Sequence, residues 1–182
     1  VLITLEVHDA GRVNEDLQMT EVMTRPISGG PEWIEVYNDN AFATSLYGWS
    51  INTSSGSTSN EVLLQGGVIQ GHSVALFTGS LASQEQGNAS QMFDLGQYGL
   101  LGTGSMNLLD DGSGVIELRF TRPGKVNPIP NSKAEWGPLA GLPVGLNQVI
   151  VWDGTNTMSS TAWSVQTGPT PGDVFFGPSN AS

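Results

Sequence analysis

The stretch EWIEVYN, residues 32–38, decides the fold class of this chain. Its side chains alternate as they do in an extended strand, where successive residues point to opposite faces. Such a strand carries two aromatic rings and a carboxylate on one face and two aliphatic side chains on the other: Trp33, Glu35 and Tyr37 against Ile34 and Val36. If the first face is buried, the carboxylate must be hydrogen-bonded, which favours a structural role for Glu35 over a catalytic one.

Short stretches of the same kind recur along the chain between turn residues, and no helical period competes with them. The further predicted strands are 3–7, 19–23, 46–51, 62–64, 74–77, 106–109, 115–120, 149–152 and 162–165. Strands of this length and spacing are typical of two stacked antiparallel sheets. The sequence therefore predicts an all-β fold, an antiparallel immunoglobulin-like β-sandwich of about nine strands.

The segment 121–147 interrupts this pattern because it is rich in proline, which cannot donate a hydrogen bond into a central ladder. It also contains both lysines of the chain, Lys125 and Lys133, with Trp136 just beyond. Loops of this length are usually functional or mobile. We interpret it as a long loop insertion with two open roles, a structural cover over one edge of the sandwich or a recognition loop.

Composition excludes several classes of function. The 182 residues carry a net charge of −11, yet only 13% are charged, about half the usual share. Six Lys and Arg residues against 17 Asp and Glu argue against a nucleic-acid partner, and no apolar run is long enough for a membrane span. The absence of Cys excludes thiolate catalysis and thiolate metal sites. A surface of Gly, Ser, Thr and Asn with few lysines favours an extracellular or cell-surface location.

Candidate chemical sites are sparse, and we predict neither catalysis nor a cofactor. His8 and His72 lie far apart in the sequence, and no nucleophile motif accompanies them. Asp110 and Asp111 lie in a predicted hairpin and could offer oxygen ligands to Ca²⁺, although an Asp-Gly turn explains them as well. The glycosylation sequons at Asn52, Asn88 and Asn180 are frequent by chance in a chain of this composition.

The N-terminal residues suggest a route to self-association. Ile3, Leu5 and Val7 alternate with polar residues in a strand that a polar tether, residues 9–16, separates from the rest of the chain. Such a strand can pair with its own sheet, or it can complete the sheet edge of a second copy. Donation from copy to copy does not close on itself and produces filaments. We therefore divide the chain into a strand and tether at 1–16, a sandwich at 17–173 and a C-terminal tail at 174–182.

Four stretches in this order resemble the lamin tail domain, an immunoglobulin-like β-sandwich that also occurs in secreted bacterial proteins. They are MTEVMTRP at 19–26, EWIEVYN at 32–38, LYGWSI at 46–51 and the closing GPTPG at 168–172. The resemblance implies a non-catalytic module for scaffolding or binding, and it carries over no ligand. The proline-rich segment and the strand at residues 1–8 depart from the family pattern.

The sequence thus predicts a non-enzymatic extracellular structural or adhesive module, a filament or surface-layer subunit linked to copies of itself by N-terminal strand donation. The alternative is an accessory module that binds a carbohydrate, cell wall or cell-surface protein. That function would use the proline-rich loop, with Lys125, Lys133 and Trp136 as its candidate contact residues.

Overall fold

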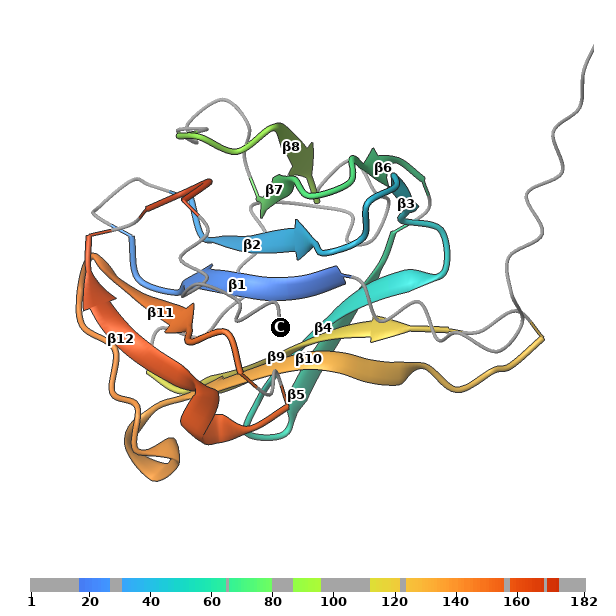
Figure 1. Cartoon of the computed structure of the whole chain (residues 1–182). Helices are drawn as coiled ribbons and strands as arrows, with labels where there is room; N and C mark the ends of the chain where they lie inside the picture. Colours follow the sequence, from blue (N-terminus) through green and yellow to red (C-terminus); the bar gives the residue numbers. More distant parts are fainter. Residues whose placement is uncertain are drawn as a thin grey trace, which may run out of the picture.

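The computed structural model describes residues 17–26, 31–64, 66–79, 87–95, 112–121, 124–155, 158–168 and 170–173. These residues form β-strands and two short 3₁₀ helices, so the predicted all-β fold is confirmed (Figure 1). The elements are β1 (Leu17–Met23), β2 (Trp33–Asn38), β3 (Thr44–Ser45), β4 (Trp49–Ser55), β5 (Thr58–Leu63), β6 (Val68–Ile69), β7 (Val74–Thr78), β8 (Gln91–Asp94), β9 (Gly114–Phe120), β10 (Ile129–Trp136), η1 (Pro138–Ala140), β11 (Gln148–Trp152), η2 (Ser160–Ala162) and β12 (Trp163–Thr167).

The strands form two main layers. One is a six-stranded sheet in the order β12-β11-β1-β2-β7-β8, and the other is a four-stranded sheet in the order β10-β9-β4-β5. Strands β3 and β6 form a small third sheet beside them. Among the described strands, β7 and β8 make the one parallel pair, and every other pair is antiparallel. The architecture is a sandwich whose described strands number twelve rather than about nine.

The main hydrophobic core lies between the two layers. Ile34 and Val36 of β2, Trp49 of β4 and Leu118 of β9 all belong to it and are at most 1% exposed. The alternation in EWIEVYN is therefore confirmed, since its aliphatic residues face the core and Trp33 belongs to a second cluster. Burial of these apolar side chains, at about 25 cal/mol per Å² removed from water, is the main force that holds the layers together.

The proline-rich segment contains a strand, which corrects its interpretation as a loop insertion. Strand β10 pairs with β9 along its whole length and forms one edge of the four-stranded sheet. The ladder shifts register between Pro130 and Ser132, and this irregularity accommodates a proline in an edge strand. Prolines are compatible with this strand because β10 lies at the edge of its sheet and the prolines lie near the ends of the strand.

The motif LYGW makes a turn that leads into β4, where the sequence predicts a continuous strand from Leu46. Trp49 N donates to Leu46 O, and Gly48 has φ of 87°, which is unfavourable for other residues. The turn leaves Tyr47 exposed and places Trp49 beside Phe120, with ring centroids 5.1 Å apart. Glycine thus ends one strand and begins the next.

The other predicted segments have mixed outcomes. β3, β6 and β8 lie where the sequence predicts no strand, and the predicted strand 106–109 lies outside the described residues. Residues 1–16 and 174–182, the predicted tether and tail, also lie outside them. In the described part of the chain, no helix is long and apolar enough to cross a membrane.

Candidate functional site

The outer face of the six-stranded sheet, which points away from the core, is largely buried over β11, β1, β2 and β7. Its side chains form a second apolar cluster made of Met23, Trp33, Val74, Leu76, Ala89, Val149 and Val151, with Tyr37 and Met92 packed against it. A sheet of an antiparallel sandwich commonly exposes this face to water. Here the chain covers it, and the cover creates an unusual polar site.

The site is a pair of glutamates in the middle of that apolar face. Glu21 of β1 and Glu35 of β2 are direct cross-strand neighbours, and their side chains are 2% and 1% exposed. Val151 of β11 lies beside Glu21, and Leu76 of β7 lies beside Glu35, so a row of four residues runs across the sheet with both acids at its centre.

A bulge in β1 puts Glu21 on this face. The ladder between β1 and β2 shifts between Met19 and Glu21, which leaves Thr20 as an extra residue. Met19 consequently belongs to the main core, whereas Met23 belongs to the outer cluster. Without the bulge, strict alternation would put Met19, Glu21 and Met23 on one face, as the sequence suggests.

The C-terminal end of the described chain supplies hydrogen-bond donors to both acids. We call Thr170–Asp173 the closing segment. Thr170 donates to Glu21 through its backbone N, at 3.0 Å from Oε1, and through its hydroxyl, at 3.1 Å from Oε2. Gly172 N donates to Glu35 Oε2 at 2.6 Å, and the Thr20 hydroxyl donates to Glu35 Oε1 at 2.5 Å.

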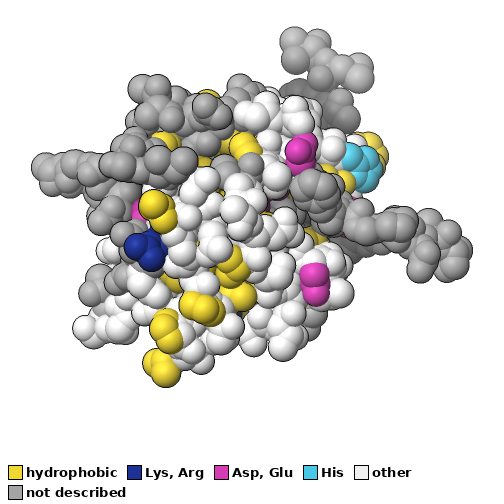
Figure 2. Space-filling view, turned by 90° about the vertical axis from the view of Figure 1, so that its left-hand side faces the viewer, with side chains coloured by type: hydrophobic (Ala, Val, Ile, Leu, Met, Phe, Trp, Pro, Cys, Tyr) yellow, Lys and Arg dark blue, Asp and Glu magenta, His cyan; other side chains and the backbone are white. Residues whose placement is uncertain are grey.

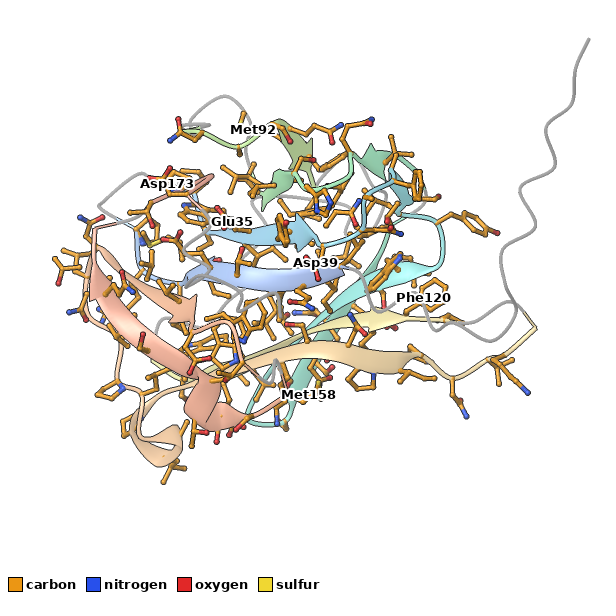
Figure 3. The ribbon with its side chains drawn as sticks, in the orientation of Figure 1. Glu35, Asp39, Met92, Phe120, Met158 and Asp173 are labelled. Carbon is orange, nitrogen blue, oxygen red and sulfur yellow. The ribbon has the colours of Figure 1, made fainter. Side chains whose placement is uncertain are left out.

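The sequence of the closing stretch matches this arrangement. In Pro169-Thr170-Pro171-Gly172 the two prolines have no N–H, so Thr170 and Gly172 carry the only backbone donors. Each of these donors meets one carboxylate. We call the arrangement of Glu21, Glu35, Thr170 and Gly172 the carboxylate clasp, and Figure 3 shows Glu35 of β2 below Asp173 of the closing segment.

The segment Gly87–Ala89 lies against the other side of the closing segment. Asn88 N donates to Pro171 O at 2.9 Å, and Asn88 Nδ2 donates to Asp173 Oδ1 at 2.6 Å. A Cβ atom on Gly172 would lie 2.0 Å from Ala89 N, which no side chain tolerates. The closing segment is therefore held between the sheet and a second stretch of backbone, and only glycine fits at position 172.

Burial is the main influence on the pKa values of the two glutamates of the clasp. The pKa of Glu21 is raised to about 7, mainly by desolvation and in part by the charges of Glu35 and Asp173, against the opposing effect of the Thr170 hydrogen bonds. Burial also raises the pKa of Glu35, against the hydrogen bonds from Thr20 and Gly172. None of the ion pairs among the described residues involves either glutamate.

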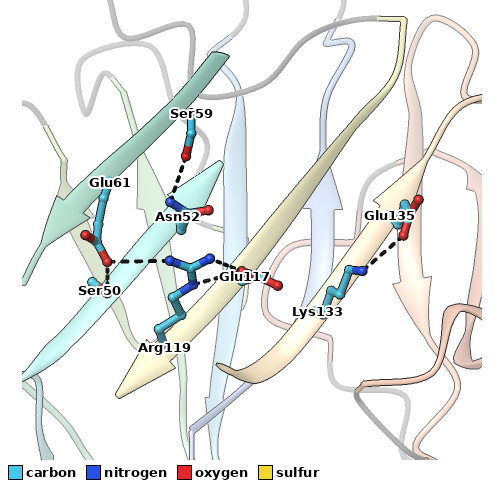
Figure 4. A network of polar contacts seen from close by, with 8 residues as sticks. All are labelled: Ser50, Asn52, Ser59, Glu61, Glu117, Arg119, Lys133 and Glu135. Carbon is cyan, nitrogen blue, oxygen red and sulfur yellow. Dashed lines mark hydrogen bonds and ion pairs between the residues drawn. The ribbon is translucent and has the colours of Figure 1, made fainter. Parts of the chain in front are cut away.

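The outer face of the four-stranded sheet is quite different, because its polar side chains are partly solvated and paired (Figure 4). Arg119 donates to Glu117 Oε2 through Nε at 2.8 Å and lies 4.0 Å from Glu61 Oε1. Ser50 donates to the same Glu61 oxygen at 2.8 Å. Nearby on β10, Lys133 Nζ lies 3.1 Å from Glu135 Oε2. This face offers water an array of satisfied polar groups.

The structure does not bring the predicted loop residues together as a recognition site. Trp136 is 2% exposed and belongs to the main core, so the expectation that it anchors an exposed loop is wrong. Lys133 lies on β10 in its ion pair with Glu135, and Lys125 is exposed in the connection before that strand. Trp136 is buried because its strand packs on the core rather than leaving the sandwich.

Several other predicted residues lie outside the described part of the chain. They are the self-association residues Ile3, Leu5 and Val7, the Ca²⁺ candidates Asp110 and Asp111, and His8 and Asn180. Within the described residues, no three His, Cys, Asp or Glu side chains are placed to hold a metal ion. His72 is exposed, 3.4 Å from the Tyr37 hydroxyl. The side chains of Asn52 and Asn88 donate to Ser59 and Asp173 respectively.

The sequence predicts a hydrogen-bonded structural role for Glu35 if its face is buried, and its burial and two donors confirm this. It does not identify Glu21 as the partner. The available signal is an acid amid the apolar residues of MTEVM, the same local pattern as in WIEVY. Comparison of the chain with protein-family models finds no match, and comparison with curated proteins finds none either.

Proposed function

We propose that the protein is a non-enzymatic structural or adhesive module that works outside the cytoplasm and joins copies of itself by strand addition. In this proposal, β12 of one copy accepts the N-terminal strand of the next, with Ile3, Leu5 and Val7 as its alternating residues. The resemblance to lamin tail domains supports a scaffolding module of this kind. The surface chemistry agrees, since charged side chains are few among the described residues on the face in Figure 2.

The observation that carries the proposal is the composition of the β12 edge. β12 pairs with β11 alone among the described strands, and it contains no charge, no proline and no bulge. Natural proteins usually protect an edge strand with one of these features. The other edges have them, since β10 carries Pro130 and a register shift, β5 carries Glu61 and β8 carries Asp94.

The tether does not by itself select between pairing within one copy and pairing between copies. A strand added beyond β12 would lie about 14 Å from β1, at about 4.8 Å per strand. Residues 9–16 can span roughly 27 Å when extended. Both arrangements are within reach, so the dependence of association on protein concentration must decide between them.

Sedimentation velocity over a range of concentrations tests the proposal. We expect the full chain to form oligomers that grow with concentration and a chain lacking residues 1–16 to remain monomeric. The double variant Ser164→Lys/Gln166→Lys places charges on the exposed side of β12 and should weaken association. The matched control Leu63→Lys, on the exposed face of edge strand β5, should leave association unchanged. Monomers in all forms of the protein would refute strand addition.

A second candidate function follows from two exposed aromatic residues. Phe42 and Tyr47 flank β3 and are 76% and 77% exposed, and such rings can stack on the flat faces of sugars. We therefore propose, as the alternative, an accessory module that binds carbohydrate at this end rather than through the proline-rich segment. Phe42→Ala/Tyr47→Ala should abolish retardation in polysaccharide gels, whereas Leu139→Ala, also fully exposed, should not change it. Equal migration of the wild type with and without polysaccharide would refute this alternative.

A further inference from the structure

The carboxylate clasp joins two acids that cannot both ionise without cost. Glu21 and Glu35 are cross-strand neighbours, and the residues on either side of them in the row, Val151 and Leu76, are apolar. When both are charged, two like charges lie side by side away from water. A proton retained by the pair removes one of these charges and leaves the remaining oxygens free to accept hydrogen bonds.

Among the described residues, no cationic group packs against the pair to compensate for its charge. β11 contributes Val151 and β7 contributes Leu76, and the segment over the clasp contributes the neutral Asn88. The closing segment contributes Asp173, a third negative charge. The Thr20 hydroxyl of β1 donates to Glu35, whereas Tyr37 of β2 contacts His72, and Arg25, just beyond β1, donates to Val144 O.

Unlike Glu21 and Glu35, the closing segment lies outside the strand ladders. It follows β12 through Gly168, which has φ of 84° and no atom close to where a Cβ would lie. Among the described residues, five hydrogen bonds join it to Glu21, Glu35 and Asn88; three of them end on the two acids and two come from Asn88. Lifting it would admit water to both carboxylates while the ladders of β1 and β2 remain paired.

We propose that the carboxylate clasp is a proton-controlled latch, which holds the closing segment while the Glu21–Glu35 pair retains a proton and releases it when both carboxylates are ionised. The latch is closed in acid and opens as the solution becomes alkaline. Desolvation raises the pKa of Glu21 to about 7, which places the change near neutrality. This inference is separate from strand addition, because it concerns the outer face over β1 and β2 and not the hydrogen-bonding edge of β12.

Hydrogen exchange at the amides of Thr170 and Gly172 tests the latch, with rates expressed as protection factors. Between pH 5.5 and 8.5, we expect protection at both amides to fall on the order of 30-fold. This factor follows if the pKa of Glu21 is about 7 in the closed latch and 4.5 after release. At both pH values these amides should be less protected than the amides of β4 and β9, because release is local.

The variant Glu21→Gln keeps an acceptor oxygen and cannot titrate, so it should remove the pH dependence. Glu117→Gln, the same change on the outer face of the other sheet, should leave it intact. A pH-independent protection factor in the wild type would overturn the latch, as would exchange of Thr170 and Gly172 at the rate of the β4 amides. If Glu21→Gln does not fold, carbon NMR can follow the titration of the Glu21 carboxyl in the wild type. A titration midpoint more than one pH unit from the midpoint at which amide protection is lost contradicts the proposal.

Discussion

The outer faces of the two sheets accommodate an acidic side chain in opposite ways, one by contact with water and a cation and the other by burial under a covering segment. Glu35 and Glu117 share a local pattern, an acid between two aliphatic residues in the middle of a strand. Glu117 is partly solvated and contacts Arg119. Glu35 is covered by the closing segment and contacts only a hydroxyl and a backbone N–H. The strand itself therefore does not determine what an acid on it does. The segment that covers the strand determines it.

The difference has an energetic consequence. A charge on the solvated face is stabilised by water whether or not its partner is present, so its interactions contribute little to stability. A carboxylate on the covered face depends on the few donors that reach it, and the loss of one leaves a buried acceptor unsatisfied. We expect substitutions on the covered face to have large and pH-dependent effects and those on the solvated face to have small ones.

The largest effect is expected from Gly172→Ala. The new methyl group would lie 2.0 Å from Ala89 N, and the residue would have to keep a φ of 86°, so the closing segment could not dock. We expect the free energy of unfolding to fall by about 3 kcal/mol. The control Gly168→Ala has a similar φ of 84° in open space and should cost about 1 kcal/mol. Urea denaturation measures both, and equal losses would contradict the covered arrangement.

The next largest effect is the pH dependence of stability. Folding raises the pKa of Glu21 from 4.5 to about 7, so the folded state binds more protons between these values, and stability falls as pH rises. From pH 5 to pH 8 this group alone should reduce the free energy of unfolding by roughly 2–3 kcal/mol. In Glu21→Gln the decrease should be absent, whereas in Glu117→Gln it should persist. A wild type that becomes more stable over this range would contradict the burial of Glu21 as an uncompensated acid.

The sequence predicted the layers because alternation is a local property. In EWIEVYN the alternation of residue types predicts which side chains share a face, and the structure confirms that division. The same reasoning placed β7, β9 and β11 within one or two residues of their bounds. It failed for β10, where prolines in an edge strand resembled a loop, and for β8, a four-residue strand that pairs in parallel with β7.

The clasp could be predicted only in part. The sequence predicts a hydrogen-bonded Glu35 if its face is buried, and it marks GPTPG as a closing stretch. It does not predict that Gly172 of this stretch contacts Glu35, 137 residues away in the sequence. Glu21 was missed because the bulge at Thr20 changes the face on which it lies, and nothing in MTEVM announces a bulge. Covers and bulges depend on distant segments, so a local pattern cannot reveal them.

A smaller effect is expected from Thr20→Val, which keeps the shape of the bulge residue and removes the donor to Glu35 Oε1. We expect a loss of about 1–2 kcal/mol at neutral pH, because the carboxylate loses one of its two donors. Thr24→Val is the matched control, since the Thr24 hydroxyl is buried and makes no hydrogen bond to the described residues. It should be neutral or slightly stabilising by thermal denaturation. If the control costs as much as Thr20→Val, the hydrogen bond to Glu35 is not the source of the loss.

The smallest effect tests the solvated face. Lys133 and Glu135 are 3.1 Å apart, with about a third of each side chain exposed, so their attraction is screened by water and salt. A double-mutant cycle with Lys133→Gln and Glu135→Gln should give a coupling energy of about 0.5 kcal/mol or less, and it should decrease when salt is added. A coupling above about 1 kcal/mol that resists salt would mean that this face is covered too. Both outer faces would then be covered by other parts of the chain. Glu117, like Glu35, would be an acid shielded from water by a second layer.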